Sequence, residues 1–77
     1  MDVLSNEAKL PLARLTDREL DVLRRTALGE TNAQIAAGLG VTVHAVKFHL
    51  GSIFKKLDVK NRTTAAAVYL GRADGGI

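Results

Sequence analysis

The chain has 77 residues, no cysteine and a formal net charge of +3. A chain of this length makes a single domain with a small core, and the lack of cysteine excludes a disulfide framework and a thiolate metal site. The longest apolar runs are too short to span a bilayer, and the N-terminus lacks the pattern of a secretion signal, so we expect no membrane partner and a cytoplasmic protein.

The first 14 residues show no sustained hydrophobic period and contain the only proline, Pro11. A leader of this kind is typical of a connection between domains. We therefore interpret residues 1–14 as a linker or flexible N-terminal tail, residues 15–72 as the folded domain, and residues 73–77 as a frayed C-terminus.

The first predicted helix covers residues 16–28. Thr16 and Glu19 form a capping box, in which the side chain of each residue accepts a hydrogen bond from the backbone N–H group of the other, and Gly29 ends the helix. The inner stripe of this helix is expected to hold Leu20, Leu23 and Ala27. Val22 points away from that stripe and needs a second packing partner, for which we expect the last helix.

Three more helices are predicted, at residues 31–39, 42–57 and 61–71. Thr31 and Gln34 make a second capping box, and Gly40 ends that helix. Thr42 and Asn61 are suitable caps for the last two helices. Because no β-strand pattern is present along the chain, the predicted fold is an all-α, four-helix domain.

Residues 31–57 have the pattern of two helices joined by a tight turn. Ala36 is small enough for the point where the helices cross, Gly40 supplies the positive φ that a short turn needs, and Val46 anchors the second helix inward. Besides Ala36, the first of these helices is expected to bury Ile35 and Leu39. The arrangement is typical of helix-turn-helix modules that bind DNA, and an ordinary helical hairpin is the alternative.

Helical geometry divides the residues of the 42–57 helix between two faces. The inner face carries four apolar residues: Val46, Leu50, Ile53 and Leu57. The outer face carries five residues of other kinds: His44, Lys47, Phe48, Gly51 and Lys55. A glycine inside a helix costs about 1 kcal/mol relative to alanine, so Gly51 favours close approach to another surface.

We expect a separate contact for each of three ring-bearing side chains on this helix, Phe48, His44 and His49. An outward-facing Phe48 needs a partner, which the methyl group of a thymine would supply, and the alternative is a ring folded back onto a neighbouring helix. His44 is placed to contact a phosphate or the edge of a base. His49 lies at the boundary of the core, where we expect it to bond to the backbone.

Positive charge is concentrated in residues 41–62, which carry five basic side chains against Asp58 alone, whereas residues 1–40 carry five basic and six acidic ones. Phosphate backbones bind such segments through counterion release, and a solvated helix face is the alternative. His44 and His49 lie on different faces without a carboxylate cluster, and no nucleophile has a plausible base. We therefore predict no metal site, no cofactor and no enzyme activity.

Several blocks of the sequence resemble a known family. They are Leu15-Thr16-x-Arg18-Glu19, Gly29-x-x-Asn32-x-x-Ile35-Ala36, Val46-Lys47-x-His49, Lys56-Leu57 and Asn61-Arg62. Over about residues 15–72 the chain resembles the LuxR-type (NarL/FixJ-like) helix-turn-helix domain of bacterial transcription regulators. The resemblance implies a four-helix domain whose third helix enters the major groove of DNA and whose fourth helix forms a homodimer on paired half-sites.

The resemblance and the outer face together indicate which residues contact DNA. The candidates for base contacts are His44, Lys47, Phe48 and Gly51. The candidates for contacts to the DNA backbone are Asn32, Thr42, Val43, Ser52 and Lys55. Two residues depart from the family pattern, since Asp17 stands where proline is frequent and Asp58 where glycine is common, and we expect the turn at Asp58 to differ or to be strained. Gly51 lacks the side chain that some relatives use, so their target sequence does not transfer.

The helix at residues 61–71 is apolar nearly all round, and three other helices can cover only one of its faces. One face consists of Ala65, Val68 and Tyr69. The other consists of Ala66, Ala67 and Leu70, which we interpret as the contact of a two-fold dimer. Residues 1–14 folded over this second face are the alternative.

We therefore expect sequence-specific binding of double-stranded DNA for transcription regulation, by the effector domain of a response regulator or by a small standalone regulator. RNA polymerase is a further candidate partner. Two other functions stay open, a σ-factor-like promoter-reading domain and a helical protein-interaction module without DNA binding. The Val46-Lys47-x-His49 block argues against the first, and Lys47 and Lys55 on the outer face argue against the second.

Overall fold

The structure is a computed structural model that describes residues 11–71. Four helices follow one another in this range: α2 (Asp17–Ala27), α3 (Asn32–Leu39), α4 (Val43–Leu57) and α5 (Arg62–Tyr69). A helical turn at residues 11–13 precedes α2, and the described residues contain no strand. The predicted all-α, four-helix domain is therefore confirmed, with the last helix ending at Tyr69 instead of Gly71.

Of the predicted tail at residues 1–14, the first ten residues lie outside the described residues, as does the predicted frayed end at residues 73–77. Leu12, in the turn before α2, packs against the core. Across residues 11–71, no helix has both the length and the apolar composition needed to cross a bilayer.

Each helix begins at the cap that the sequence predicted. Thr16 Oγ1 accepts from the N–H group of Glu19 at 3.1 Å, and Glu19 Oε1 accepts from the N–H group of Thr16 at 2.9 Å. Thr31 and Gln34 form the second capping box in the same way. The remaining caps are Thr42 for α4 and Asn61 for α5. A cap joins residues only three positions apart, which is why the sequence alone places helix starts well.

Apolar side chains from all four helices meet in one core. The buried members are Val22, Leu23, Ile35, Ala36, Val46, Leu50, Ile53, Leu57 and Ala65. They include all four residues of the predicted inner face of α4, whereas Leu39 of α3 is only half-buried against the core. Full burial of a Val, Leu or Ile side chain contributes about 1.5–3 kcal/mol, so this core is the main source of stability.

The inner face of α2 differs from the prediction. Leu20 is 37% exposed and Ala27 is half-buried, and the buried stripe consists of Glu19, Val22, Leu23 and Thr26. Thr26 can be buried because its Oγ1 donates to the backbone oxygen of Val22 at 2.9 Å, which satisfies the hydroxyl. Val22 is fully buried, and α2 packs against the last helix as expected.

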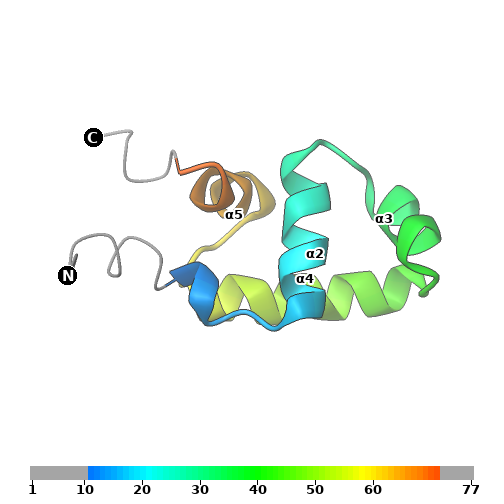
Figure 1. The fold of residues 1–77 in the computed structure, drawn as a ribbon, viewed down its shortest axis with the longest axis horizontal. Coiled ribbons are helices and arrows are strands. Elements are labelled where there is room, and N and C mark those ends of the chain that lie inside the picture. Colours follow the sequence, from blue (N-terminus) through cyan, green and yellow to red (C-terminus); the bar gives the residue numbers. More distant parts are fainter. Residues whose placement is uncertain (1–10, 72–77) are drawn as a thin grey trace.

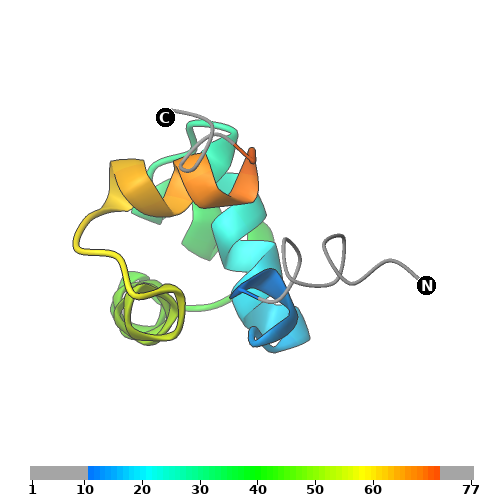
Figure 2. The ribbon, with the colours of Figure 1, turned by 90° about the vertical axis from the view of Figure 1, so that its left-hand side faces the viewer.

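The helices are arranged around α2. In Figure 1, α4 runs along the lower edge of the domain, α2 crosses it, and α3 and α5 lie on opposite sides of α2. Contacts join α2 to each of the other helices, and α4 to α3 and α5. Figure 2 shows α4 end-on, with α5 above it and α2 to its right. One long side of α4 therefore remains uncovered by the other described helices.

The turn between α4 and α5 contains the departure that the sequence indicated. Asp58 follows α4 with φ +56°, the only positive φ at a residue other than glycine among those described. Most L-residues resist this left-handed conformation, which costs roughly 1–2 kcal/mol. Its carboxylate also lies at the negative end of the α4 dipole. The predicted strain in this turn is therefore confirmed.

Replacing Asp58 with glycine should stabilise the domain. We expect Asp58→Gly to raise the free energy of unfolding by about 0.5–1 kcal/mol, the relief of backbone strain being partly offset by the greater freedom of glycine in the unfolded chain. Urea unfolding measures the change. Asp58→Asn removes the charge but keeps the side chain, so it should recover less of the gain, and a destabilised glycine variant would contradict this account of the turn.

Candidate nucleic-acid interface

The turn between α3 and α4 has the geometry that a helix-turn-helix unit requires. Gly40 closes α3 with φ +69°, and the N–H group of Val41 donates to the carbonyl of Ala36 at 3.0 Å. Ala36 is 5% exposed and Val46 is fully buried, as expected for a small crossing residue and an inward anchor. These three residues fix α4 against α3 and leave the outer face of α4 uncovered.

Four of the five predicted outer-face residues line one shallow groove of about 450 Å³. They are Lys47, Phe48, Gly51 and Lys55, and Ser52 completes the lining. The fifth, His44, is exposed on the first turn of the same helix. Phe48 is 71% exposed, so the alternative of a ring folded back onto a neighbouring helix is wrong. Its nearest aromatic neighbour is His49, with ring centroids 6.0 Å apart in an edge-on arrangement.

A buried carboxylate locks α4 onto α2. Lys56 Nζ donates to Glu19 Oε1 at 2.8 Å, and Ser52 Oγ donates to Glu19 Oε2 at 2.8 Å. The N–H group of Thr16 supplies a third donor to this carboxylate. Glu19 itself is only 5% exposed. The sequence predicts Glu19 in the capping box, but its two partners from α4 lie more than 30 positions away and were not predicted.

Burial of Glu19 would by itself raise the pKa of its carboxyl, but the hydrogen bonds from Lys56, Thr16 and Ser52 and the charge of Lys56 outweigh it and lower the pKa to about 2. A carboxyl whose pKa is lower in the folded state than in the unfolded state stabilises the fold only while it is ionised. That stabilisation is complete above the ordinary pKa of 4.5 and disappears as the pH falls towards 2.

Acid should therefore weaken the domain through Glu19. Between pH 5 and pH 2 we expect about 1–3 kcal/mol of the free energy of unfolding to be lost through this one group. Urea unfolding at several pH values measures the loss. Glu19→Gln cannot titrate, so its curve should fall less steeply than that of the wild type. Parallel curves for the two proteins would show that Glu19 is not the acid-sensitive group.

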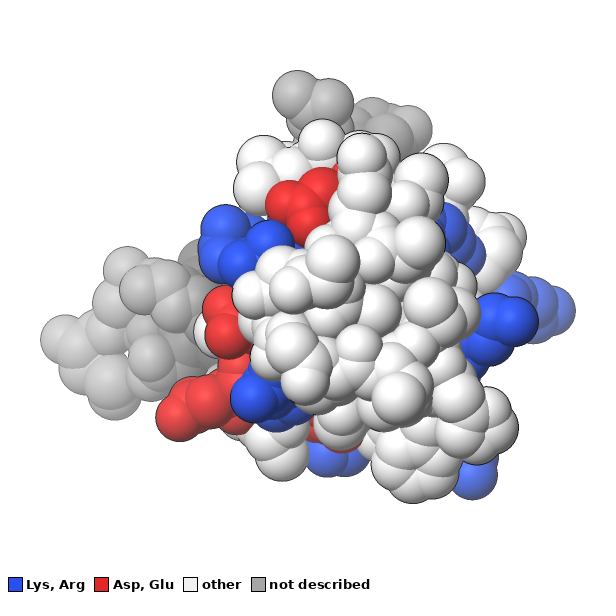
Figure 3. Space-filling view, turned by 90° about the vertical axis from the view of Figure 1, so that its right-hand side faces the viewer, with Lys and Arg blue, Asp and Glu red and all other residues white. Residues whose placement is uncertain are grey.

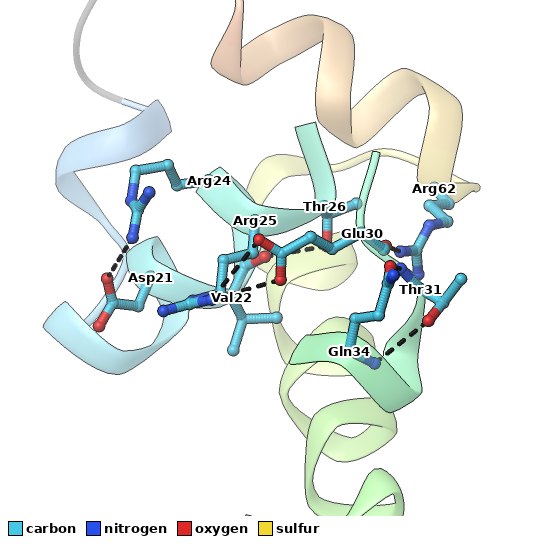
Figure 4. A network of polar contacts seen from close by, with 9 residues as sticks. All are labelled: Asp21, Val22, Arg24, Arg25, Thr26, Glu30, Thr31, Gln34 and Arg62. Atoms are coloured by element: carbon cyan, nitrogen blue, oxygen red, sulfur yellow. Dashed lines mark hydrogen bonds and ion pairs between the residues drawn. The ribbon is translucent and has the colours of Figure 1, made fainter. Parts of the chain in front are cut away.

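The loop between α2 and α3 is held from two directions. Arg62, the first residue of α5, donates to the side-chain oxygen of Asn32 and to the backbone oxygen of Glu30. Figure 4 shows Arg62 reaching this loop from α5 while Arg25 of α2 meets the carboxylate of Glu30, at 3.3 Å. The start of α3 is thus tied to both flanking helices.

These contacts show that some of the basic side chains in residues 41–62 are not available to bind a partner. Lys56 and Arg62 are engaged within the fold, so their charge mainly holds the domain together. Lys47, Lys55 and Lys60 are exposed and take part in none of the ion pairs found among the described residues. The positive charge offered to a partner is therefore smaller than the sequence count indicates.

The other predicted contact residues lie around the starts of the two helices. Thr42 and Val43 are exposed at the start of α4, where unpaired N–H groups suit an anion, and Asn32 opens α3 with its oxygen bound to Arg62. Ser52 already donates its hydroxyl to Glu19, which leaves it without a proton for a phosphate oxygen. His49 is half-buried as predicted, but the expected bond from its side chain to the backbone is not found within residues 11–71.

Figure 3 shows the end of the domain formed by α3 and the start of α4. The centre of this face is uncharged, which agrees with the sequence of α3, Asn32–Leu39, where no residue is charged. The charged side chains along the right-hand edge are all Lys or Arg, whereas acidic and basic side chains lie side by side on the left. The face thus presents a neutral centre beside a positive rim.

The predicted dimer face lies on α5. Ala65 is buried on the inner side of that helix, and Val68 and Tyr69 pack against the core. On the other side, Ala66 and Ala67 are half-buried and Leu70 is 47% exposed. A partly uncovered apolar strip is therefore present on the described surface of α5.

Comparison with known proteins agrees with this architecture. The family described as "Bacterial regulatory proteins, luxR family" (GerE) matches residues 13–69. The transcriptional regulatory protein LiaR of Bacillus subtilis is 47% identical over 62 residues, which cover 80% of this chain and 29% of LiaR. The nitrate/nitrite response regulator protein NarP of Escherichia coli is 42% identical over 60 residues, covering 78% of this chain and 28% of NarP.

A third relative, the transcriptional activator protein AnoR of Acinetobacter nosocomialis, is 51% identical over 59 residues, covering 74% of this chain and 25% of AnoR. The chain thus spans less than a third of the length of these three relatives.

Proposed function

The chain belongs to the luxR family of bacterial regulatory proteins, a family of DNA-binding transcription regulators, and we propose that its helix α4 enters the major groove of duplex DNA and reads a specific base sequence. The observation that carries the proposal is the division of α4 into two faces. Its inner residues are sealed in the core, while Lys47, Phe48, Gly51 and Lys55 line a groove on the outside.

The dimensions of α4 fit this role. Its 15 residues make a rod about 22 Å long, and the major groove is about 12 Å wide. Lys47 lies in the first half of the rod, where it reaches base edges and donates to guanine O6 and N7. Lys55 lies two turns later, about 12 Å further along the axis, and reaches a phosphate at the edge of the groove.

Phosphate contacts at the other end of the interface come from the starts of α3 and α4. We expect the N–H groups of Val43 and His44, which follow the Thr42 cap, and the side-chain NH2 group of Asn32 to donate to phosphate oxygens. Because Ala36, Gly40 and Val46 fix α4 against α3, phosphate contacts at the starts of these helices would set the position of Lys47 on the duplex. Duplex DNA as the ligand also implies the bacterial cytoplasm as the compartment.

The relatives are longer than this chain, and their names describe response regulators and transcriptional regulators. We therefore propose that the chain acts as the DNA-binding part of such a regulator. Selection from a pool of random duplexes tests the function. We expect enrichment of one sequence in two half-sites about one turn of DNA apart. A pool that stays random after several rounds would contradict sequence-specific binding.

Two protomers would then meet through the strip formed by Ala66, Ala67 and Leu70. Leu70→Asp places a carboxylate in this apolar contact, so we expect about a tenfold loss of affinity for a duplex with two half-sites. Affinity for a single half-site should stay unchanged, which separates dimerisation from folding and from base reading. Gel-shift titration of both duplexes measures the effect. If the variant and the wild type bind the duplex with two half-sites equally well, the dimer contact does not include Leu70.

A further inference from the structure

The groove on α4 has an apolar part that the proposed contacts of Lys47 and Lys55 leave unused. Phe48 and Gly51, which lie about one helical turn apart, line this part. At 71%, Phe48 is the most exposed large hydrophobic side chain among the described residues. Its ring therefore contributes little to the core, and its place at the centre of a cationic face calls for an apolar partner.

Gly51 is not required by the fold. A Cβ atom added there would meet nothing within 4 Å, and the backbone is ordinary right-handed helix. Glycine is also the poorest helix former after proline. Its visible effect is to leave open the space beside the Phe48 ring, between two lysines each one turn away. The missing side chain of Gly51 thus leaves a hollow beside Phe48 on the outer face of α4, the face that would approach a ligand.

We propose that this hollow receives the 5-methyl group of a thymine, so that Phe48 and Gly51 select a thymine at one fixed position of each half-site. The proposal rests on the DNA-binding function proposed above and names part of its target. In the major groove, thymine is the base that presents a methyl group, and the remaining base edges are mostly hydrogen-bond donors and acceptors. The flanking lysines attract the phosphate backbone of DNA to this face, and they offer no such attraction to a neutral apolar partner.

The position of the thymine follows from the helix. Phe48 directly follows Lys47, and neighbouring side chains on a helix diverge by about 100°. The thymine should therefore lie within about two base pairs of the guanine that accepts from Lys47. Selected half-sites should contain both bases at a constant separation.

Replacement of thymine by deoxyuridine removes only the methyl group and tests the proposal. In the selected duplex, each thymine of a half-site is replaced in turn, and the Kd of the wild-type domain is measured. We expect one position at which the loss of the methyl group weakens binding about fourfold. Phe48→Ala should bind the thymine and uracil duplexes equally, whereas Lys55→Ala should bind both more weakly and keep the ratio between them.

Gly51→Ala provides a second test with a distinct signature. The added methyl group should raise the thermal midpoint, because alanine favours helix, yet weaken binding to the thymine duplex more than to the uracil duplex. The proposal is overturned if no uracil substitution changes the Kd, or if Phe48→Ala retains the preference for thymine. Either result leaves the selected sequence bound, whereas a failure of the proposed function would show as no selected sequence at all.

Discussion

Glu19→Ala should destabilise the domain by about 2–4 kcal/mol, the largest stability effect expected of a residue outside the apolar core. The substitution removes the acceptor of three hydrogen bonds at once and leaves Lys56 and Ser52 on α4 without their partner. Lys56 is partly exposed and can turn its ammonium group to water, which keeps the loss below that of a fully buried pair. In a domain of this size the change corresponds to a fall of roughly 8–30 °C in Tm.

Urea unfolding gives the measurement, and Asp21→Ala is the matched control on the same helix. Asp21 pairs with Arg24 at 3.6 Å, but both side chains are about half exposed, so its loss should cost under about 0.5 kcal/mol. The double variant Glu19→Ala with Lys56→Met should lose less free energy of unfolding than the two single variants lose together. The reason is that both substitutions remove the same interaction. If Glu19→Ala unfolds no more easily than Asp21→Ala, the carboxylate does not lock α4 onto α2.

Lys47→Ala should lower affinity for the selected sequence by about 1–3 kcal/mol, which is roughly fivefold to 150-fold. Lys47 is exposed and contributes nothing to the core, so the thermal midpoint should change little. Its effect should fall mainly on the specific sequence, because a contact to a base edge has no counterpart on random DNA.

The control for this prediction is Lys55→Ala, which removes a lysine from the same groove. If Lys55 contacts a phosphate, its loss should weaken selected and random duplexes alike and reduce the slope of log K against log salt by about 0.9. Fluorescence anisotropy at several salt concentrations measures both variants. If Lys47→Ala binds both selected and random DNA as tightly as the wild type does, Lys47 does not contact bases.

The local features of the fold could be predicted from the sequence. The capping boxes at Thr16 and Thr31, the positive φ at Gly40 and the inner stripe of α4 each depend on residues within one or two turns of each other. The strained turn at Asp58 was also predictable, because an L-residue stands where the chain must turn left-handed. The two faces of α4 followed from helical angles alone, so the outer face on which the groove lies could be predicted.

Contacts between distant parts of the chain could not be predicted in this way. The sequence favoured Leu20 as an inner residue and left Glu19 and Thr26 out of the inner stripe, since polar side chains are rarely buried. The structure buries both polar residues because each finds its partners, and Leu20 is displaced to the edge. Likewise, nothing near Arg62 reveals that its guanidinium reaches Asn32 and Glu30. The spacing of Glu19 with Val22, Leu23 and Thr26 on one helical face was the available signal.

Methylation interference on the selected duplex tests most directly whether α4 reads DNA in the major groove. Dimethyl sulfate modifies guanine at N7, in the major groove, and adenine at N3, in the minor groove. If α4 lies in the major groove with Lys47 on a guanine, methylation at guanine N7 within each half-site should prevent binding, and methylation at adenine N3 there should be tolerated. Interference confined to adenine N3, or none within the half-sites, would contradict the placement of α4.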